Sequence, residues 1–180
     1  MKKNIQYDIT NIVASIDINE KLNLDKLKAN FKNAKYNPDV YFALIYKLHT
    51  PKLSILVNWS GKLIFTGAKK ISDIENARKI FFEDIKRLGY TPKNNVININ
   101  NIVVKIDFNS PLKLEKIFEI NINQNIEFEK EIFPGLILKH EDPKFTALIF
   151  KSGKVIMTGL KELETIKIAI EILENKILIN

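Results

Sequence analysis

Side chains that catalyse reactions or bind metals are scarce in this sequence of 180 residues. The absence of cysteine excludes disulfides and thiolate metal sites, and His49 and His140 are the only histidines. Glu127, Glu129 and Glu131 alternate along a predicted strand, a spacing more typical of a solvated strand than of an acid–base pair or a metal site. No Ser/His/Asp arrangement, phosphate-binding loop or other metal-ligand spacing is visible. We therefore expect no enzyme and no cofactor, and both histidines at the surface.

The net charge of +7 is compatible with a polyanionic partner, although many soluble proteins share such a balance. Residues 1–92 hold 16 Lys+Arg against 9 Asp+Glu, whereas residues 93–180 hold 12 of each. All of the surplus therefore lies in the first half. Because no uncharged apolar run is long enough to span a membrane, and the N-terminus has no signal-peptide core, we expect the protein inside a cell.

One unit occurs twice in the chain. Asn11-Ile12-Val13 recurs as Asn101-Ile102-Val103 at an offset of 90, and the segment from Tyr36 recurs from Phe128 at an offset of 92. These identities predict a first repeat at 1–92 and a second at 93–180, joined in one continuous fold. The second register pairs Leu44/Leu136, Ile45/Ile137, Lys47/Lys139, Pro51/Pro143, Lys52/Lys144, Leu56/Leu148, Ser60-Gly61-Lys62/Ser152-Gly153-Lys154 and Thr66-Gly67/Thr158-Gly159.

Each repeat is predicted to contain a strand, a helix, four strands and a second helix. In the first repeat, residues 8–18 are extended and apolar, and apolar side chains follow at helical spacing over 24–31. Turn residues then separate the next apolar runs, which indicates antiparallel hairpins. These turn residues are Pro38, Thr50-Pro51 and Ser60-Gly61.

The second helix of each repeat carries a long apolar stripe. In the first repeat Ser72 and Glu75 predict a capping box, and the stripe ends near Gly89. In the second repeat Ser110-Pro111 predicts the start of the short helix, and the long stripe covers residues 163–177.

The predicted strands are apolar on both faces. Leu53, Ile55 and Val57 alternate with Leu56, whereas antiparallel sheets normally keep one face polar. Two helices cover only one face of a five-stranded sheet, so the other face needs an external cover. The candidates are a second subunit, an apolar ligand, or a nucleic-acid groove entered by apolar side chains.

Over nearly its whole length the chain resembles the TATA-binding proteins. The family pattern is an Asn-Ile-Val strand, a "stirrup" loop ending in an aromatic residue, a Pro-Lys turn, a strand ending Leu-x-Phe before x-Ser-Gly-Lys, and then Thr-Gly. It fits both repeats. The second repeat carries it nearly intact, as Glu131-Ile132-Phe133-Pro134-Gly135, Pro143-Lys144, Leu148-Ile149-Phe150-Lys151-Ser152-Gly153-Lys154 and Thr158-Gly159.

The resemblance implies an α+β fold, a pseudo-two-fold saddle of two repeats with a ten-stranded curved antiparallel sheet and four helices on its convex face. It implies a general transcription initiation factor that binds and bends the minor groove of AT-rich TATA-box promoter DNA. The implied protein partners are transcription factor B, which it recruits, and RNA polymerase. An archaeal-type core implies a cytoplasmic, nucleoid-associated protein, and a eukaryotic source would imply a nuclear one.

The resemblance also assigns roles to residues. The rings that open base steps match Phe133 and Phe150, with Tyr41 and Asn58 at the corresponding positions of the first repeat. Polar groups for base edges match Asn11, Asn101, Thr66 and Thr158, and apolar groove contacts match Val13, Val103, Leu56, Leu148, Ile64 and Ile156. Phosphate contacts match Lys47, Lys52, Lys62, Lys139, Lys144 and Lys154, and the surface for transcription factor B matches Glu129, Glu131 and Ile132.

The first repeat departs from the family pattern at Tyr41 and Asn58. Tyrosine can still act as a wedge, whereas asparagine cannot do so in the same way. Phe42 and Trp59 are each one residue away, but a shift of one along a strand reverses the face unless a bulge intervenes. We therefore expect a lopsided bend, in which the positive surplus of the first half compensates through phosphate attraction.

Three alternatives remain open on the sequence alone. A paralogue can keep the fold without bending DNA, a carrier can hold an apolar ligand, and a homodimer without DNA can bury the apolar face.

Overall fold

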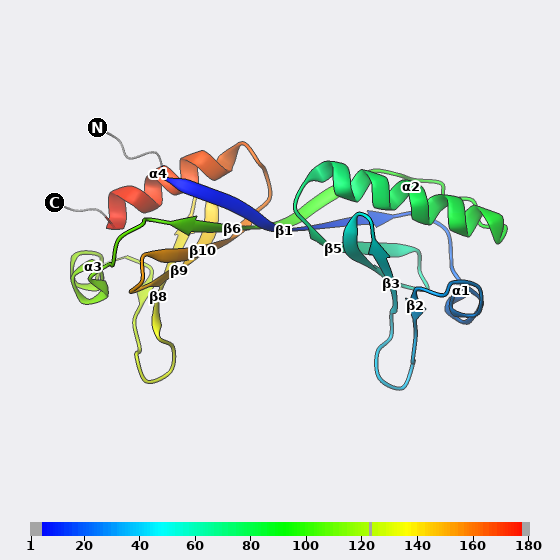
Figure 1. Ribbon diagram of the computed structural model, residues 1–180, viewed down its shortest axis with the longest axis horizontal. Coiled ribbons are helices and arrows are strands. Elements are labelled where there is room, and N and C mark those ends of the chain that lie inside the picture. The colour runs from blue at the N-terminus through cyan, green and yellow to red at the C-terminus, as the bar shows by residue number, and fades with distance from the viewer. Residues whose placement is uncertain (1–4, 123, 178–180) are drawn as a thin grey trace. The chain divides into compact units, whose positions relative to one another are not determined.

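The computed structural model describes residues 5–122 and 124–177 (Figure 1). These residues form four helices and ten strands, and the strands follow the order β2-β3-β4-β5-β1-β6-β10-β9-β8-β7 in one sheet. The order ends at two free edges, β2 and β7, so the sheet is not closed into a barrel. The predicted α+β class, with ten antiparallel strands and four helices, is confirmed.

Backbone contacts divide the chain into two units, which are described separately. We call residues 11–100 the first unit, and residues from 101 onward together with those up to 10 the second unit. The first strand contributes to both, because its first residues belong to the second unit. The predicted repeat boundary at residue 92 concerns copies in the sequence and stays a prediction.

The elements follow the predicted order of strand, helix, four strands and helix in each repeat. The first set is β1 (Gln6–Asp17), α1 (Leu24–Asn30), β2 (Ala34–Lys35), β3 (Leu44–His49), β4 (Lys52–Val57), β5 (Lys62–Ala68) and α2 (Ile71–Arg87). The second set is β6 (Asn98–Asp107), α3 (Leu114–Ile120), β7 (Ile126–Glu127), β8 (Gly135–Glu141), β9 (Lys144–Phe150), β10 (Lys154–Leu160) and α4 (Thr165–Ile177).

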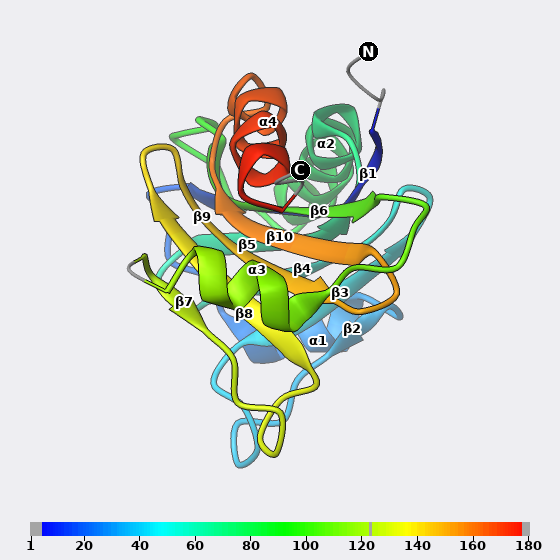
Figure 2. The ribbon, with the colours of Figure 1, turned by 90° about the vertical axis from the view of Figure 1, so that its left-hand side faces the viewer.

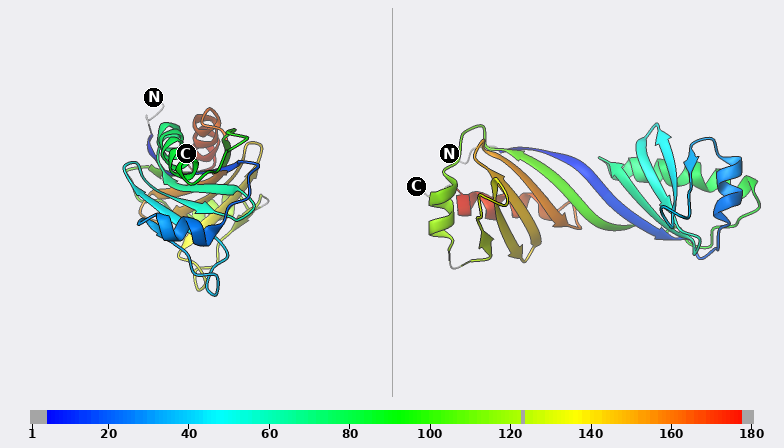
Figure 3. Two further views of the ribbon diagram at one scale, coloured as in Figure 1. Left: turned by 90° about the vertical axis from the view of Figure 1, so that its right-hand side faces the viewer. Right: turned by 90° about the horizontal axis from the view of Figure 1, so that it is seen from below.

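One face of the strands in each unit is buried under a long helix. In the first unit α2 packs on β4 and β5, and the loop between β2 and β3 points away from α2 (Figure 1 and Figure 3, left). In the second unit α4 lies on one face and the loop between β7 and β8 points away from it (Figures 1 and 2). Alternate residues are therefore buried along much of the strands, as in Ile12, Ala14 and Ile16 of β1 or Leu53, Ile55 and Val57 of β4.

Two predicted helix starts are wrong. Helix α2 begins at Ile71 and not after Ser72, because the Asp73 carboxylate accepts hydrogen bonds from the backbone N–H groups of Lys69 and Lys70, at 3.4 and 3.2 Å. Helix α3 begins at Leu114, beyond Ser110-Pro111. The segment before α3 is instead held to the turn between β9 and β10, where the N–H of Leu112 donates to the carbonyl of Lys151 at 2.9 Å.

The predicted strand with three alternating glutamates is also wrong. Strand β7 ends at Glu127, and Glu129 and Glu131 lie in the following loop. This loop turns because the N–H groups of Ile132 and Phe133 both donate to the carbonyl of Glu129, at 3.0 and 2.9 Å. The carboxylates therefore do not line one strand face.

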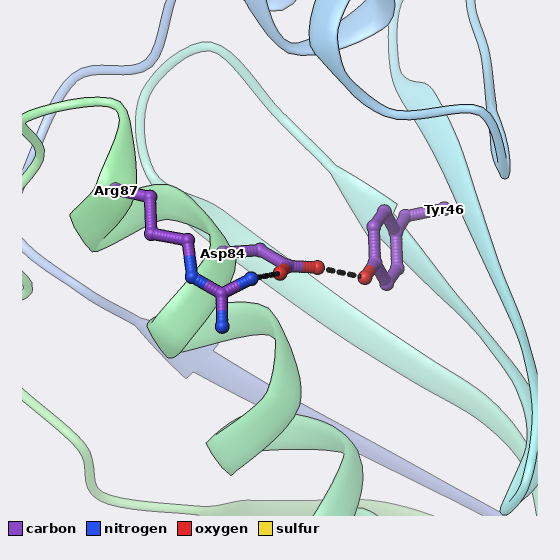
Figure 4. Close-up of polar contacts among 3 residues, drawn as sticks. All are labelled: Tyr46, Asp84 and Arg87. Atoms are coloured by element: carbon purple, nitrogen blue, oxygen red, sulfur yellow. Dashed lines mark hydrogen bonds and ion pairs between the residues drawn. The ribbon is translucent and has the colours of Figure 1, made fainter.

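Tyr46 anchors the core of the first unit. Its ring is 2% exposed and packs edge-on against Phe31 and Phe81, with centroid distances of 5.6 and 5.2 Å. Its hydroxyl donates to the carboxylate of Asp84, which also pairs with Arg87 at 3.2 Å (Figure 4). Burial, above all, raises the pKa of Tyr46 to about 12, and the neighbouring Asp84 adds to the rise.

This raised pKa predicts a loss of stability at alkaline pH. An unfolded tyrosine ionises near pH 10, whereas folded Tyr46 keeps its proton to about pH 12, so the free energy of unfolding should fall between these values. The expected fall is roughly 2 kcal/mol for a shift of this size. Denaturant unfolding at pH 9 and pH 12 should show a smaller fall for Tyr46→Phe, which should also cost about 1 kcal/mol at neutral pH. An equal fall in both proteins would contradict this account.

Candidate nucleic-acid interface

The strand residues that alternate with the buried ones form a second face in each unit, which we call the open face. The open face of the first unit comprises Asn11, Val13, Ser15, Ile45, Lys47, Ser54, Leu56, Ile64 and Thr66. That of the second unit comprises Asn101, Val103, Lys105, Ile137, Lys139, Thr146, Leu148, Ile156 and Thr158. All eighteen residues are at least partly exposed.

Four of the six predicted apolar contacts lie in continuous rows across neighbouring strands, which Ile45 and Ile137 extend. In the first unit Ile45 is opposite Leu56, which is opposite Ile64. The second unit repeats the row with Ile137, Leu148 and Ile156. Each row lies next to a polar row, in which Thr66 is opposite Ser54 and Thr158 is opposite Thr146. The open faces therefore combine an apolar strip with short polar side chains.

A β-bulge at each Thr-Gly pair orients the predicted base-edge asparagine. The register of β1 and β5 shifts at Gly67, whose φ of +97° is a conformation that favours glycine. The N–H of Gly67 then donates to Oδ1 of Asn11 at 2.7 Å. The second unit repeats this with Gly159, at a φ of +103°, which donates to Oδ1 of Asn101 at 2.7 Å.

This arrangement leaves the asparagine side chains as hydrogen-bond donors. Since Oδ1 accepts from a backbone N–H, the Nδ2 group is the end that remains to serve a partner. In the second unit Nδ2 of Asn101 donates to the Thr158 hydroxyl at 3.0 Å, and this hydroxyl lies 3.1 Å from Oδ1, so one of the two N–H groups of Nδ2 is left for a partner. Asn101 and Thr158 are thus brought together as one polar site.

All six predicted phosphate lysines project from the open side of the strands and are exposed. They are Lys47, Lys52, Lys62, Lys139, Lys144 and Lys154. Lys139 is partly neutralised, because its ammonium group contacts the Glu127 carboxylate at 2.5 Å.

A groove of about 820 Å³ in the first unit adds two more lysines. It is lined by Lys47 and Lys52 together with Lys69, Lys70 and Asp73. Four of its lining residues are thus lysines, and the apolar residues Leu48, Pro51 and Leu53 line it as well.

The predicted wedge rings of the second unit lie together. Phe133, in the loop, and Phe150, at the end of β9, have ring centroids 5.7 Å apart and planes at 61°. Both rings lie over Gly135, where an added Cβ would come within 2.7 Å of Phe133 and 3.2 Å of Phe150. Gly135 is therefore a close-packing position that admits the ring pair.

The first unit does not bring its predicted wedge residues together as rings. Asn58 stays in the turn after β4, where its Oδ1 accepts from the N–H of Ser60 at 3.0 Å. Tyr41 instead packs on Phe42, with centroids 4.7 Å apart.

The three residues predicted to contact transcription factor B lie in one loop of the second unit. Glu129, Glu131 and Ile132 are all exposed, and Ile132 is exposed to 80%. In the same loop the Lys130 ammonium contacts the Glu115 carboxylate at 2.5 Å, which lowers the pKa of Glu115.

The two histidines belong to different units and differ in exposure. His49 is exposed, as expected, whereas His140 is half-buried, with Nδ1 3.1 Å from the Pro143 carbonyl and its ring stacked on Phe145. Within 5–122 and 124–177, no cluster of three metal-binding side chains is present. No helix in these ranges has the length and apolar character needed to cross a membrane.

Sequence reasoning missed several open-face residues. Ser54 and Thr146 face the predicted threonines, and only the strand register reveals this. Lys105 was missed as well: it is opposite Ile156, whereas Ser15 is opposite Ile64 at the corresponding place in the first unit. The offset of 90 between Ser15 and Lys105 was a signal that could have revealed this difference.

Comparisons with known proteins agree with this geometry. The family model "Transcription factor TFIID (or TATA-binding protein, TBP)" matches residues 6–88 and again 96–178. TATA-box-binding protein-like 1 of Entamoeba histolytica is 38% identical over 88% of this chain and 73% of its own length. TATA-box-binding protein B of Halobacterium salinarum is 39% identical over 84% of this chain and 82% of its own length.

A solved structure supports the same assignment. Methanococcus jannaschii TBP superposes with a TM-score of 0.84 at 34% identity, covering 95% of this chain and 97% of that one. The twofold family match, the similar relatives and this structure show that the chain belongs to the TATA-binding protein family, a family of DNA-binding general transcription initiation factors.

Proposed function

We propose that this protein binds the minor groove of AT-rich promoter DNA with its open faces, opens base steps with aromatic rings and bends the duplex. The observation that carries this proposal is the donor site of Asn101, whose Oδ1 is held by the Gly159 N–H. A·T pairs offer only acceptors in the minor groove, whereas G·C pairs add an amino group that would collide with a close-fitting apolar surface. Outward donors beside an apolar strip match A·T pairs.

Protein partners form the second part of the proposal. The exposed loop with Glu129, Glu131 and Ile132 binds transcription factor B, and through it RNA polymerase. Two carboxylates beside an exposed isoleucine suit a basic partner surface with an apolar pocket. The protein accordingly acts at the chromosome, in the nucleoid or in a nucleus.

Three alternatives make different forecasts for the same measurements. A paralogue that does not bend DNA is favoured by the turn-bound Asn58, and it would bind AT-rich duplexes without shortening their end-to-end distance. For an apolar-ligand carrier, ligand binding would be insensitive to salt. A permanent homodimer would remain dimeric in sedimentation with DNA.

Removal of one wedge ring tests the central claim. Phe150→Ala should weaken binding to an AT-rich duplex about tenfold, because base–ring stacking and apolar burial are lost. The measurement is a titration of AT-rich and GC-substituted duplexes at several salt concentrations. Binding to the GC-substituted duplex should be weak for both proteins. An equal proportional loss on both duplexes would count against wedging in the minor groove.

An isosteric change separates the donor of Asn101 from its structural acceptor. Asn101→Asp keeps an oxygen for the Gly159 N–H but removes the Nδ2 donor, so the thermal midpoint should be nearly unchanged while affinity for AT-rich DNA falls at least about tenfold. Asn101→Ala removes both groups and should lower the thermal midpoint as well, because the Gly159 N–H loses its partner. If Asn101→Asp binds as tightly as the wild type, Asn101 is not a base-edge donor.

Salt dependence tests the phosphate contacts. If all six predicted lysines engage, log affinity should fall with log salt at a slope of about −5. Alanine replacement of Lys47, Lys52 and Lys62 should weaken binding more than replacement of Lys139, Lys144 and Lys154. The reason is that Lys139 already pairs with Glu127 and that the positive surplus lies in the first half. Equal or smaller losses for the first set would refute the proposed compensation.

A further inference from the structure

The wedge site of the first unit has the same backbone as that of the second but different side chains. In the second unit the N–H of Phe133 donates to the carbonyl of Glu129, and in the first the N–H of Tyr41 donates to the carbonyl of Asn37, both at 2.9 Å. Tyr41 therefore occupies the position of Phe133. The differences lie in the groups around this ring.

The two neighbours that make the Phe133 site are both replaced. Ala43, which is 4% exposed, stands where the second unit has Gly135, and a Cβ at that position would meet the rings. Asn58 stands where the second unit has Phe150 and is held in its turn by the Ser60 N–H. A second ring of the first unit, if one is present, has to come from another position.

Trp59 is not that ring. It belongs to the turn after β4, where its carbonyl accepts from the N–H of Leu22 at 2.8 Å, and the Lys21 ammonium lies 5.7 Å from its ring centroid. The printed neighbour of the Trp59 ring is thus in the segment before α1, whereas the ring neighbour of Tyr41 is Phe42.

Phe42 is the aromatic residue that can supply a second ring next to Tyr41. Strand β3 begins only at Leu44, so the rule that neighbouring residues point to opposite faces does not apply to residues 41 and 42. The Phe42 ring packs on Tyr41 with planes at 44°, and the two rings are 64% and 39% exposed. The second unit has Pro134 at this place and needs no further ring there.

We infer that Tyr41 and Phe42 together form the wedge of the first unit, with both rings on one loop, and that Phe42 takes over the role that Phe150 has in the second unit. This inference rests on the proposed DNA function. It makes the kink of the first half depend on Phe42, a residue outside the aligned wedge positions, and not on Asn58. The ligand is the π-face of an unstacked base pair in an AT-rich duplex.

The test uses a set of AT-rich duplexes. In each duplex 2-aminopurine replaces adenine at a different base step, and dyes at both ends report bending. Wild-type protein should raise the fluorescence at two separate steps, because unstacked 2-aminopurine emits more strongly. Phe42→Ala should abolish one of these signals, lengthen the end-to-end distance and weaken binding about tenfold. Phe42→Trp, which keeps a ring, should restore all three readouts.

Three controls make the result specific. Val40→Ala removes a neighbouring apolar side chain that is 79% exposed but has no ring, and it should bind and bend as the wild type does. Asn58→Ala should also leave the signal at the first step unchanged. Phe150→Ala should abolish the signal at the other step.

The outcomes separate the inference from the proposed function. If Phe150→Ala loses its signal while Phe42→Ala keeps both signals and wild-type affinity, Phe42 is not a wedge. The inference is then wrong, and the proposed function is unaffected. If neither variant changes unstacking or affinity, the aromatic rings do not act as wedges, and both the inference and the proposed function are contradicted. Because Phe42 is exposed, its replacement should leave the thermal midpoint unchanged, so a loss of signal cannot be ascribed to unfolding.

Discussion

The structure depends on one constraint: the helices of each unit cover only one face of its strands. Alternation along the strands buries Ile12, Ala14 and Ile16 on that face and leaves Val13 and its neighbours on the other. The buried face supplies the core, while the open face keeps apolar side chains in partial contact with water. An apolar strip without an internal cover is the usual mark of a partner surface. Lysines and short polar groups on the same face are compatible with the DNA that the TATA-binding protein family binds.

The polar part of the open face arises from a backbone irregularity. In a regular ladder the N–H groups of Gly67 and Gly159 would serve the neighbouring strand. The bulge at each glycine instead directs this N–H to an asparagine oxygen at 2.7 Å. The glycine is needed because its φ lies in the left-handed region, where a side chain would strain the backbone. One extra strand residue thereby fixes the orientation of the asparagine amide, with Oδ1 toward the glycine N–H.

The two units share the same backbone turns but carry different side chains on their surfaces. The loops between β2 and β3 and between β7 and β8 turn with the same hydrogen bonds, yet the rings they carry pack on different neighbours. Lys105 replaces Ser15, and Lys139 has an acidic partner in Glu127. A ligand with two similar halves therefore meets different chemistry in each unit.

The sequence by itself determined the repeat, the order of strands and helices, the exposure of one apolar face and the family, because period, turn residues and identities between the two copies can all be read directly along the chain. Two of its errors concern helix starts. The carboxylate that caps α2 is that of Asp73, and Ser72 is not the capping residue. Ser110-Pro111 precedes α3 because a backbone hydrogen bond to Lys151 holds that segment outside the helix. Only the tertiary structure decided which residues meet. The pairing of Asn101 with Gly159 depends on a shifted register, and the packing of Tyr41 on Phe42 depends on a loop whose side-chain directions no strand period describes. Contacts of this kind join residues through space, and the chain order carries no direct signal of them.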